Sequence, residues 1–273
     1  MKTDITPLSV DLYFIPIKTR IPFKFGRETL TSVTCARVCV TVADRQGQKA
    51  QGWGETPLSV QWAWPSSLGF QERCDAMQLF CSAPGGLAEA WAKLNRQGHP
   101  IELGYFFVEL MLPDLLDRFN HQRGERAEPM PWLAALVCCS AFDIALHDAY
   151  SQLLGKDVYS TYNAEFMNVD LADFLQPADN VGVSFAGKYP TDFLKYPADK
   201  RVTAWHLVGG KDLLDASELT GAEPDDGYPV LLPDWIKRDG LKCLKVKLCG
   251  NDSGWDYQRL VKVGEIALEN DVL

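Results

Sequence analysis

The stretch from Trp132 to Leu154 limits the fold more than any other part of the chain. Written as a helix, it has an unusually wide apolar face, and Gly155 follows it as a natural helix stop. A helix of this kind is buried on most of its sides, so the rest of the chain must cover it. The longest apolar run, Trp132 to Ala141, falls short of the roughly 18 residues that a membrane span needs, so no membrane partner is predicted.

Short strands are predicted before that helix. Val10 to Ile17 is rich in β-forming residues, Cys35 to Val42 alternates between two faces, and Gln51 to Glu55 returns after a polar turn. Together they predict a small antiparallel meander. The mixed segment from Pro22 to Leu30 is predicted to be a long loop, and long loops in compact domains are usually functional or disordered.

Three helices are predicted between the meander and the long apolar helix. Gln71 to Phe80, Gly86 to Asn95 and Ile101 to Phe119 have apolar residues at three- and four-residue spacing, and Pro113 is expected to break or kink the last of them. The pattern weakens from Tyr162 to Lys200, which predicts a linker or an insertion there.

The end of the chain has a different pattern. Strands are predicted at Val202 to Val208 and at Leu241 to Leu248, with helical segments after each, the clearest from Trp255 to Leu268. The order strand, helix, strand, helix predicts a parallel α/β unit.

Composition and charge exclude several classes of function. The chain has 273 residues, 27 basic and 36 acidic side chains and a net charge of −9, so a nucleic-acid partner is not predicted. The N-terminus lacks the plan of a secretory signal, and the eight cysteines are scattered without a CxxC pair. A reducing, cytoplasmic location is therefore expected.

The segment most informative about chemistry is Leu244-Lys245-Val246-Lys247-Leu248. Residues two apart in a strand share a face, so Lys245 and Lys247 lie together on the face opposite Val246. A parallel strand is normally apolar on both faces, and two ammonium groups on a covered face lower each other's pKa. A lysine with a pKa nearer neutrality is a competent general base. The alternative is an edge strand with both lysines in water.

Two other patterns suggest sites more weakly. Asp143 and His147 lie one helical turn apart beside Asp148, but no third metal ligand is evident, so packing of the helix is the favoured interpretation. Gly209-Gly210-Lys211 lacks the spacing of a phosphate-binding loop and is interpreted as a turn after a strand.

Three motifs occur in an order that resembles the enolase superfamily, in particular its mandelate racemase and muconate-lactonizing members and the dipeptide-epimerase branch. They are Gly52-Trp53-Gly54-Glu55, the helix segment Ala141 to Ala149 that leads to Leu154-Gly155-Lys156-Asp157-Val158-Tyr159, and the lysine motif at Leu244 to Leu248. The resemblance implies an α+β capping domain, made of an antiparallel meander plus helices, followed by a modified (β/α) TIM barrel.

The resemblance also implies a reaction. In that family a proton is removed from the carbon next to a carboxylate, and the resulting enediolate is held by Mg²⁺. Lys247 would be the catalytic base and Lys245 its electrostatic partner. The expected substrate is a small-molecule carboxylate, and the reaction would be a racemisation, an epimerisation, a cycloisomerisation or a lyase reaction.

Substrate-binding residues are implied in the same way. The segment from Pro22 to Thr31 corresponds to a mobile loop that closes over the substrate. Lys24, Phe25 and Arg27 in that loop are expected to help set specificity, and Glu55 is expected near the barrel mouth.

The sequence departs from the family at its end. Only 73 residues (273 − 201 + 1) run from Arg201 to Leu273, enough for two βα units, whereas a closed barrel takes about 250 residues. The family's metal ligands lie on later strands, so no residue is assigned to the metal. We expect residues 1–130 to form the capping domain, 131–200 a connecting helix with a linker or insertion, and 201–273 the start of a truncated barrel.

The predicted function is therefore that of the N-terminal portion of a Mg²⁺-dependent isomerase or lyase that is inactive by itself. Self-association as a homo-oligomer is also expected. The alternative is a non-catalytic remnant, or a binding or assembly module, that retains the capping domain.

Overall fold

The computed structural model describes residues 3–25, 28–124, 127–195 and 197–272. The chain forms two compact units. The larger unit contains Met1–Pro16 and Thr34–Ala198, and the smaller unit contains Ile17–Val33 and Asp199–Leu273. An antiparallel three-stranded meander with helices comes first, and two short parallel strands with helices follow, which confirms the predicted fold class.

The meander consists of β1 (Ile5–Phe25), β2 (Glu28–Asp44) and β3 (Lys49–Pro57), in that spatial order. β2 and β3 pair antiparallel. The carboxylate of Asp44 accepts the backbone N–H groups of Gln46 and Gln48, which closes the tight turn between β2 and β3. All three strands are longer than the alternating patterns predicted.

The predicted long loop from Pro22 to Leu30 is wrong for the described residues. β1 continues to Phe25 and β2 begins at Glu28, so the segment is the end of a hairpin, and residues 26 and 27 lie outside the described part of the chain. Thr19 and Leu30 bridge the two strands, with the Thr19 hydroxyl 3.4 Å from the Leu30 carbonyl oxygen. The physical reason is that the bulky β-forming residues of this segment extend the ladder rather than terminate it.

Helices follow the meander. They are α1 (Val60–Ala63), α2 (Phe70–Ser82), α3 (Leu87–Ala92), α4 (Pro100–Phe106) and α5 (Leu112–Arg123). A single wide π-helical stretch, Phe107–Met111, separates α4 from α5. Proline lacks an N–H group and cannot continue an α-helical ladder, so Pro113, in the first turn of α5, explains the interruption that was predicted there.

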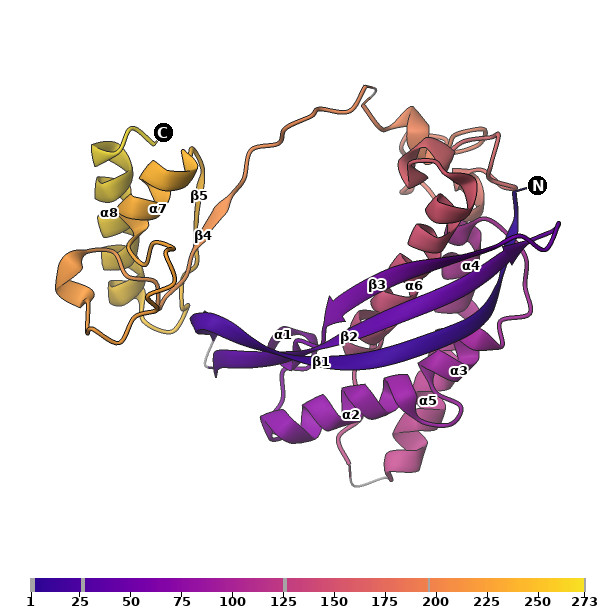
Figure 1. Cartoon of the computed structure of the whole chain (residues 1–273), viewed down its shortest axis with the longest axis horizontal. Helices are drawn as coiled ribbons and strands as arrows, with labels where there is room; N and C mark the ends of the chain where they lie inside the picture. Colours follow the sequence, from indigo (N-terminus) through magenta and orange to yellow (C-terminus); the bar gives the residue numbers. More distant parts are fainter. Residues whose placement is uncertain (1–2, 26–27, 125–126, 196, 273) are drawn as a thin grey trace. The chain divides into compact units, whose positions relative to one another are not determined.

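The long apolar helix α6 (Trp132–Leu154) has the predicted bounds. By length and composition alone it is the one helix in the described part of the chain that could cross a membrane, but 56% of its 18-residue apolar stretch is buried inside the protein. Gly155 ends it in the left-handed conformation. In Figure 1 the sheet crosses one side of α6, and the buried residues of α6 share one apolar core with the sheet and the shorter helices of the larger unit.

β3 lies directly against α6 because two of its residues have no side chain. A Cβ atom at Gly52 would be 1.9 Å from the backbone nitrogen of Ala149, and one at Gly54 would be 2.1 Å from the carbonyl oxygen of Ala141. The carboxylate of Asp148 accepts the backbone N–H of Trp53 at 2.8 Å. Two of the three motifs behind the family resemblance therefore pack on each other, and Asp148 has a structural role.

The segment after α6 contains short helical turns at Val158–Thr161, Leu171–Asp173 and Pro190–Asp192. The eight cysteines are free thiols, six of them buried.

The smaller unit contains a two-stranded parallel sheet of β4 (His206–Val208) and β5 (Leu244–Val246), as predicted. A short turn at Ala216–Glu218 and the helices α7 (Leu232–Asp239) and α8 (Ser253–Glu269) complete it. Its core is apolar and comprises Val208, Leu214, Leu232, Ile236, Leu241, Val263, Ile266 and Val272. Both strands are shorter than predicted, and Val202, expected to begin the first, is 87% exposed.

Candidate functional site

The two lysines lie on the face of β5 that points away from the core of the smaller unit. Leu244 and Val246 pack against that core, and residues two apart share a face, so Lys245 and Lys247 lie opposite them. Lys245 is exposed and Lys247 is half-buried. The backbone N–H of Lys247 donates to the carbonyl oxygen of Val208 at 2.9 Å, which fixes this residue just beyond the end of β5.

The hairpin tip, defined as the described end of β1 and the described start of β2, belongs to the same unit, and its Phe23 lies near Lys247. The ammonium nitrogen of Lys247 is 4.6 Å from the centroid of the Phe23 ring, within the range of a cation–π contact. Burial lowers the pKa of Lys247, and the positive charge of Lys245 lowers it further. A lysine with a lowered pKa is a better proton acceptor near neutral pH than an ordinary lysine.

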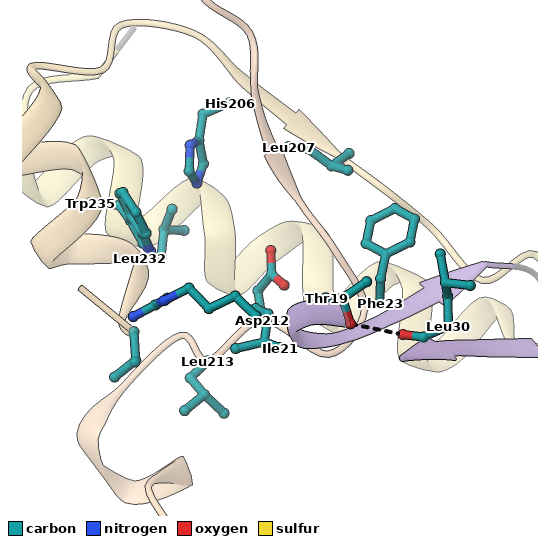
Figure 2. Close-up of a pocket in the computed structure, with 12 residues that line it drawn as sticks. Thr19, Ile21, Phe23, Leu30, His206, Leu207, Asp212, Leu213, Leu232 and Trp235 are labelled. Carbon is teal, nitrogen blue, oxygen red and sulfur yellow. Dashed lines mark hydrogen bonds between the residues drawn. The ribbon is translucent and has the colours of Figure 1, made fainter. Parts of the chain in front are cut away.

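A cavity of about 470 Å³ lies in the smaller unit, between the hairpin tip, β4 and α7 (Figure 2). Its walls are mainly apolar, with aromatic rings from Phe23 and Trp235 and aliphatic side chains from both strands of the hairpin. Leu207, the cross-strand partner of Lys245, also lines it. Lys247 is not among the residues that line the cavity, but Phe23 both lines the cavity and contacts Lys247, so the lysine is adjacent to the cavity. A largely apolar pocket of this size with a few polar groups is typical of small-molecule sites.

Arg20 joins the hairpin to the segment before α7. Its guanidinium donates to both carboxylate oxygens of Asp226, at 2.7 and 2.8 Å, and to the carbonyl oxygens of Tyr228 and Pro229, at 2.9 and 3.0 Å. These hydrogen bonds raise the pKa of Arg20 and lower the pKa of Asp226 to about 2. The pair is therefore fully ionised at neutral pH and has no net charge.

The loops that follow β4 and β5 are held by carboxylates and by one buried arginine. Asp212 accepts the N–H of Gly209 at 2.7 Å, and Asp256 accepts the N–H groups of Cys249 and Gly250 at 2.7 and 2.8 Å. The buried Arg259 donates to the carbonyl oxygens of Gly209 and Asp212. The carboxylates of Asp212 and Asp256 thus fix the backbone conformation of these two loops.

The described residues do not fit a magnesium site. Mg²⁺ prefers carboxylate and other oxygen ligands in octahedral geometry. Within residues 3–25, 28–124, 127–195 and 197–272, no group of three or more His, Cys, Asp or Glu side chains is placed to hold a metal ion. Asp212 and Asp256, which hold the loops after β4 and β5, are already hydrogen-bonded to backbone N–H groups.

The other predicted substrate-binding residues are distributed over the chain. Lys24 lies in the smaller unit, where its Cγ is 3.6 Å from the position that a Cβ atom on Gly210 would take. The side chain of Phe25 and all of Arg27 lie outside the described residues. Glu55 lies on β3 in the larger unit and forms an ion pair with Arg37, its cross-strand partner, at 2.6 Å.

Most of the cavity has no recognisable pattern in the sequence. Arg20, Phe23 and Asp226 come from two segments about two hundred positions apart, and the 206-residue separation of Arg20 and Asp226 leaves no local spacing to detect. A usable signal was the run of bulky β-formers around Phe23, which indicates a strand end rather than a loop.

Comparisons with known proteins give similarity in structure only. No protein-family model matches the chain, and no curated protein sequence matches it. A substrate-liganded L-Ala-D/L-Glu epimerase from Bacillus subtilis is similar with a TM-score of 0.44 and 14% identity, over 96% of this chain and 50% of that one. A dipeptide epimerase from Cytophaga hutchinsonii, complexed with Mg and the dipeptide D-Ala-L-Val, gives a TM-score of 0.46 and 18% identity, over 96% and 49%.

An enolase from Bradyrhizobium, complexed with magnesium and mandelic acid, gives a TM-score of 0.46 and 14% identity, over 97% of this chain and 52% of that chain. The chain thus spans about half the length of each of these three solved structures.

Proposed function

We propose that this chain supplies the capping domain and the first two βα units of an enolase-superfamily enzyme that removes a proton next to a carboxylate. The observation that supports it is the lysine pair on β5, where Lys247 is half-buried, faces the Phe23 ring and has a pKa lowered by burial and by Lys245. Lys247 is the proposed base, and Lys245 is the proposed electrostatic partner.

The environment of Lys247 suits proton abstraction. A base must be neutral before it accepts a proton, and both burial and a neighbouring cation favour the neutral amine. When Lys247 takes the proton it becomes an ammonium ion, and the Phe23 ring face then stabilises the new charge. The adjacent Lys245 ammonium favours the negative charge that develops on the substrate.

The substrate would be bound mainly by residues of the hairpin and the apolar cavity. We propose that Lys24, Phe25 and Arg27 contact it from the hairpin, and that Glu55 takes part from the larger unit. Residues 1–130 are the proposed capping domain, 131–200 the connecting helix and linker, and 201–273 the barrel portion. Because the described residues do not fit Mg²⁺, its ligands in the active enzyme are proposed to lie outside them.

Deuterium exchange tests the proposal. The protein purified from its natural source, with any chain that accompanies it, is incubated in D₂O with Mg²⁺ and a panel of dipeptides and N-acylamino acids. Exchange of the α-proton is expected, and Lys247→Ala should abolish it. Lys245→Gln should slow it, because it removes the charge that lowers the pKa of Lys247. Unchanged exchange in Lys247→Ala would contradict the assignment of the base.

A second candidate function is a non-catalytic binding or assembly module. The observation in its favour is that no metal-ligating cluster occurs among the described residues. It predicts no exchange for any substrate, and calorimetry that shows no site-specific Mg²⁺ binding even to the natively purified protein. The proposed location for either function is the cytoplasm, where the eight free thiols would remain reduced, and the state of association of the chain is proposed to be a homo-oligomer.

A further inference from the structure

The cavity beside Lys247 contains an arginine whose charge is already neutralised. Arg20 and Asp212 are the charged residues that line the cavity. A guanidinium has five N–H donors, and Arg20 directs four hydrogen bonds to Asp226, Tyr228 and Pro229. Arg20 therefore retains a single N–H donor. A carboxylate is best recognised by a pair of parallel N–H groups, and Arg20 has no such pair left.

The other charged group in the cavity is negative. One oxygen of Asp212 accepts the N–H of Gly209, and the negative charge of Asp212 favours the charged form of the neighbouring Arg259. A second carboxylate placed in this cavity would lose its hydration and meet the charge of Asp212, and an ammonium group would lose its hydration as well. Among the residues that line the cavity, both charged side chains already interact with partners of opposite charge. An apolar group would instead contact Phe23, Leu30, Leu207, Leu232 and Trp235.

We infer that the cavity selects substrates in which the group beyond the reacting carbon is uncharged and apolar, aromatic or branched aliphatic, and that the Arg20–Asp226 pair is what excludes an acidic group. This inference rests on the proposed function, because it takes the cavity to be the side-chain subsite next to Lys247. The specificity of the cavity comes from Asp226, because Asp226 is already bound to the Arg20 guanidinium that an acidic substrate would need.

Binding of simple probes tests the inference without turnover. The probes are N-acetyl-L-phenylalanine, N-acetyl-L-glutamate and N-acetyl-L-lysine, each titrated into the full chain. Binding is followed by the indole N–H resonance of Trp235, assigned with Trp235→Phe. The phenylalanine probe should bind at least about tenfold more tightly than the other two, and should shift the Trp235 resonance.

Two variants make the test specific. Asp226→Asn frees Arg20 for the ligand, so the preference for the phenylalanine probe over the glutamate probe should shrink to about unity or reverse. Asp225→Asn, at the adjacent exposed carboxylate, is the matched control and should keep the wild-type preference. Leu213→Lys places a new cation in the cavity wall while leaving the Arg20–Asp226 pair intact, and should also raise the affinity for the glutamate probe.

The outcomes separate this inference from the proposed function. Equal or tighter binding of the glutamate or lysine probe by the wild type, no binding of the phenylalanine probe, or unchanged preference in both Asp226→Asn and Leu213→Lys would overturn the inference. A chain that binds the phenylalanine probe as described but exchanges no α-protons in the native protein would refute the proposed function and leave the cavity assignment standing.

Discussion

Lowering the pH should destabilise the larger unit through His99. This side chain is fully buried, and burial lowers its pKa from 6.5 to about 3. Its Nδ1 accepts the backbone N–H of Ile101 at 3.3 Å, which caps α4, and its Nε2 lies 3.2 Å from the hydroxyl of Thr161. The imidazole is thus held neutral with its proton on Nε2, and protonation of Nδ1 would remove the cap.

The sign and size of the effect follow from the two pKa values. The unfolded chain takes up a proton on this histidine near pH 6.5, whereas the folded chain does so only near pH 3. The stability that His99 contributes is therefore complete above about pH 6.5 and is lost progressively as the pH falls toward 3. At pH 5, with about 1.4 kcal/mol per pH unit, the loss is about 2 kcal/mol.

Amide hydrogen exchange in α4 and α6 reports the stability of the larger unit alone. It is measured from pH 7.5 to 5 and corrected for the intrinsic exchange rates. The variant His99→Asn keeps a side chain able to cap α4 but removes the titrating group. The stability advantage of the wild type over this variant should shrink by about 2 kcal/mol between pH 7.5 and 5. His121→Asn, at an exposed imidazole on α5, is the control. A stability difference that stays constant with pH would refute the reasoning.

Three further predictions concern packing and the candidate site. Gly52→Ala should destabilise the larger unit by about 3 kcal/mol or more, because the new Cβ atom would clash with the backbone of α6. Gly264→Ala has open space around it and should stabilise α8 by up to about 1 kcal/mol. The free energies of unfolding of both variants are measured by chemical denaturation. Arg259→Met should cost the smaller unit about 2 kcal/mol or more, read by hydrogen exchange in β4 and α8, since two backbone carbonyls lose a buried charged donor. Lys245→Gln should raise the pKa of Lys247, measured by NMR of ¹³C-methylated lysines.

Sequence patterns predicted correctly the elements whose structure depends on residues that are close together in the chain. The bounds of α6 were predicted because its wide apolar face and its terminal glycine both occur within one continuous segment of the sequence. The orientation of Lys245 and Lys247 followed in the same way from the two-residue period of a strand. In each case the structural consequence depends on neighbours in sequence.

The elements that sequence patterns misjudged depend on distant partners. The hairpin end around Phe23 was interpreted as a loop because its composition is mixed, and the structure pairs it as strands. The Arg20–Asp226 pair had no signal, since neither residue occurs in a motif and each is ordinary by itself. Strand lengths in β4 and β5 were overestimated because an apolar run does not show how many neighbouring strands will extend the ladder.

The smaller unit is assembled from two stretches of chain, and this sets the order in which it is completed during synthesis. Arg20 leaves the ribosome 206 residues before Asp226, which at common rates of translation is a delay of roughly 10 to 40 s. During that interval the apolar side chains at the hairpin tip, such as Ile21 and Leu30, have none of their partners from the C-terminal segment. During that delay the nascent protein presents an exposed, β-prone edge to the cell, and it depends on that edge remaining unpaired until the partner segment around Asp226 has been synthesised.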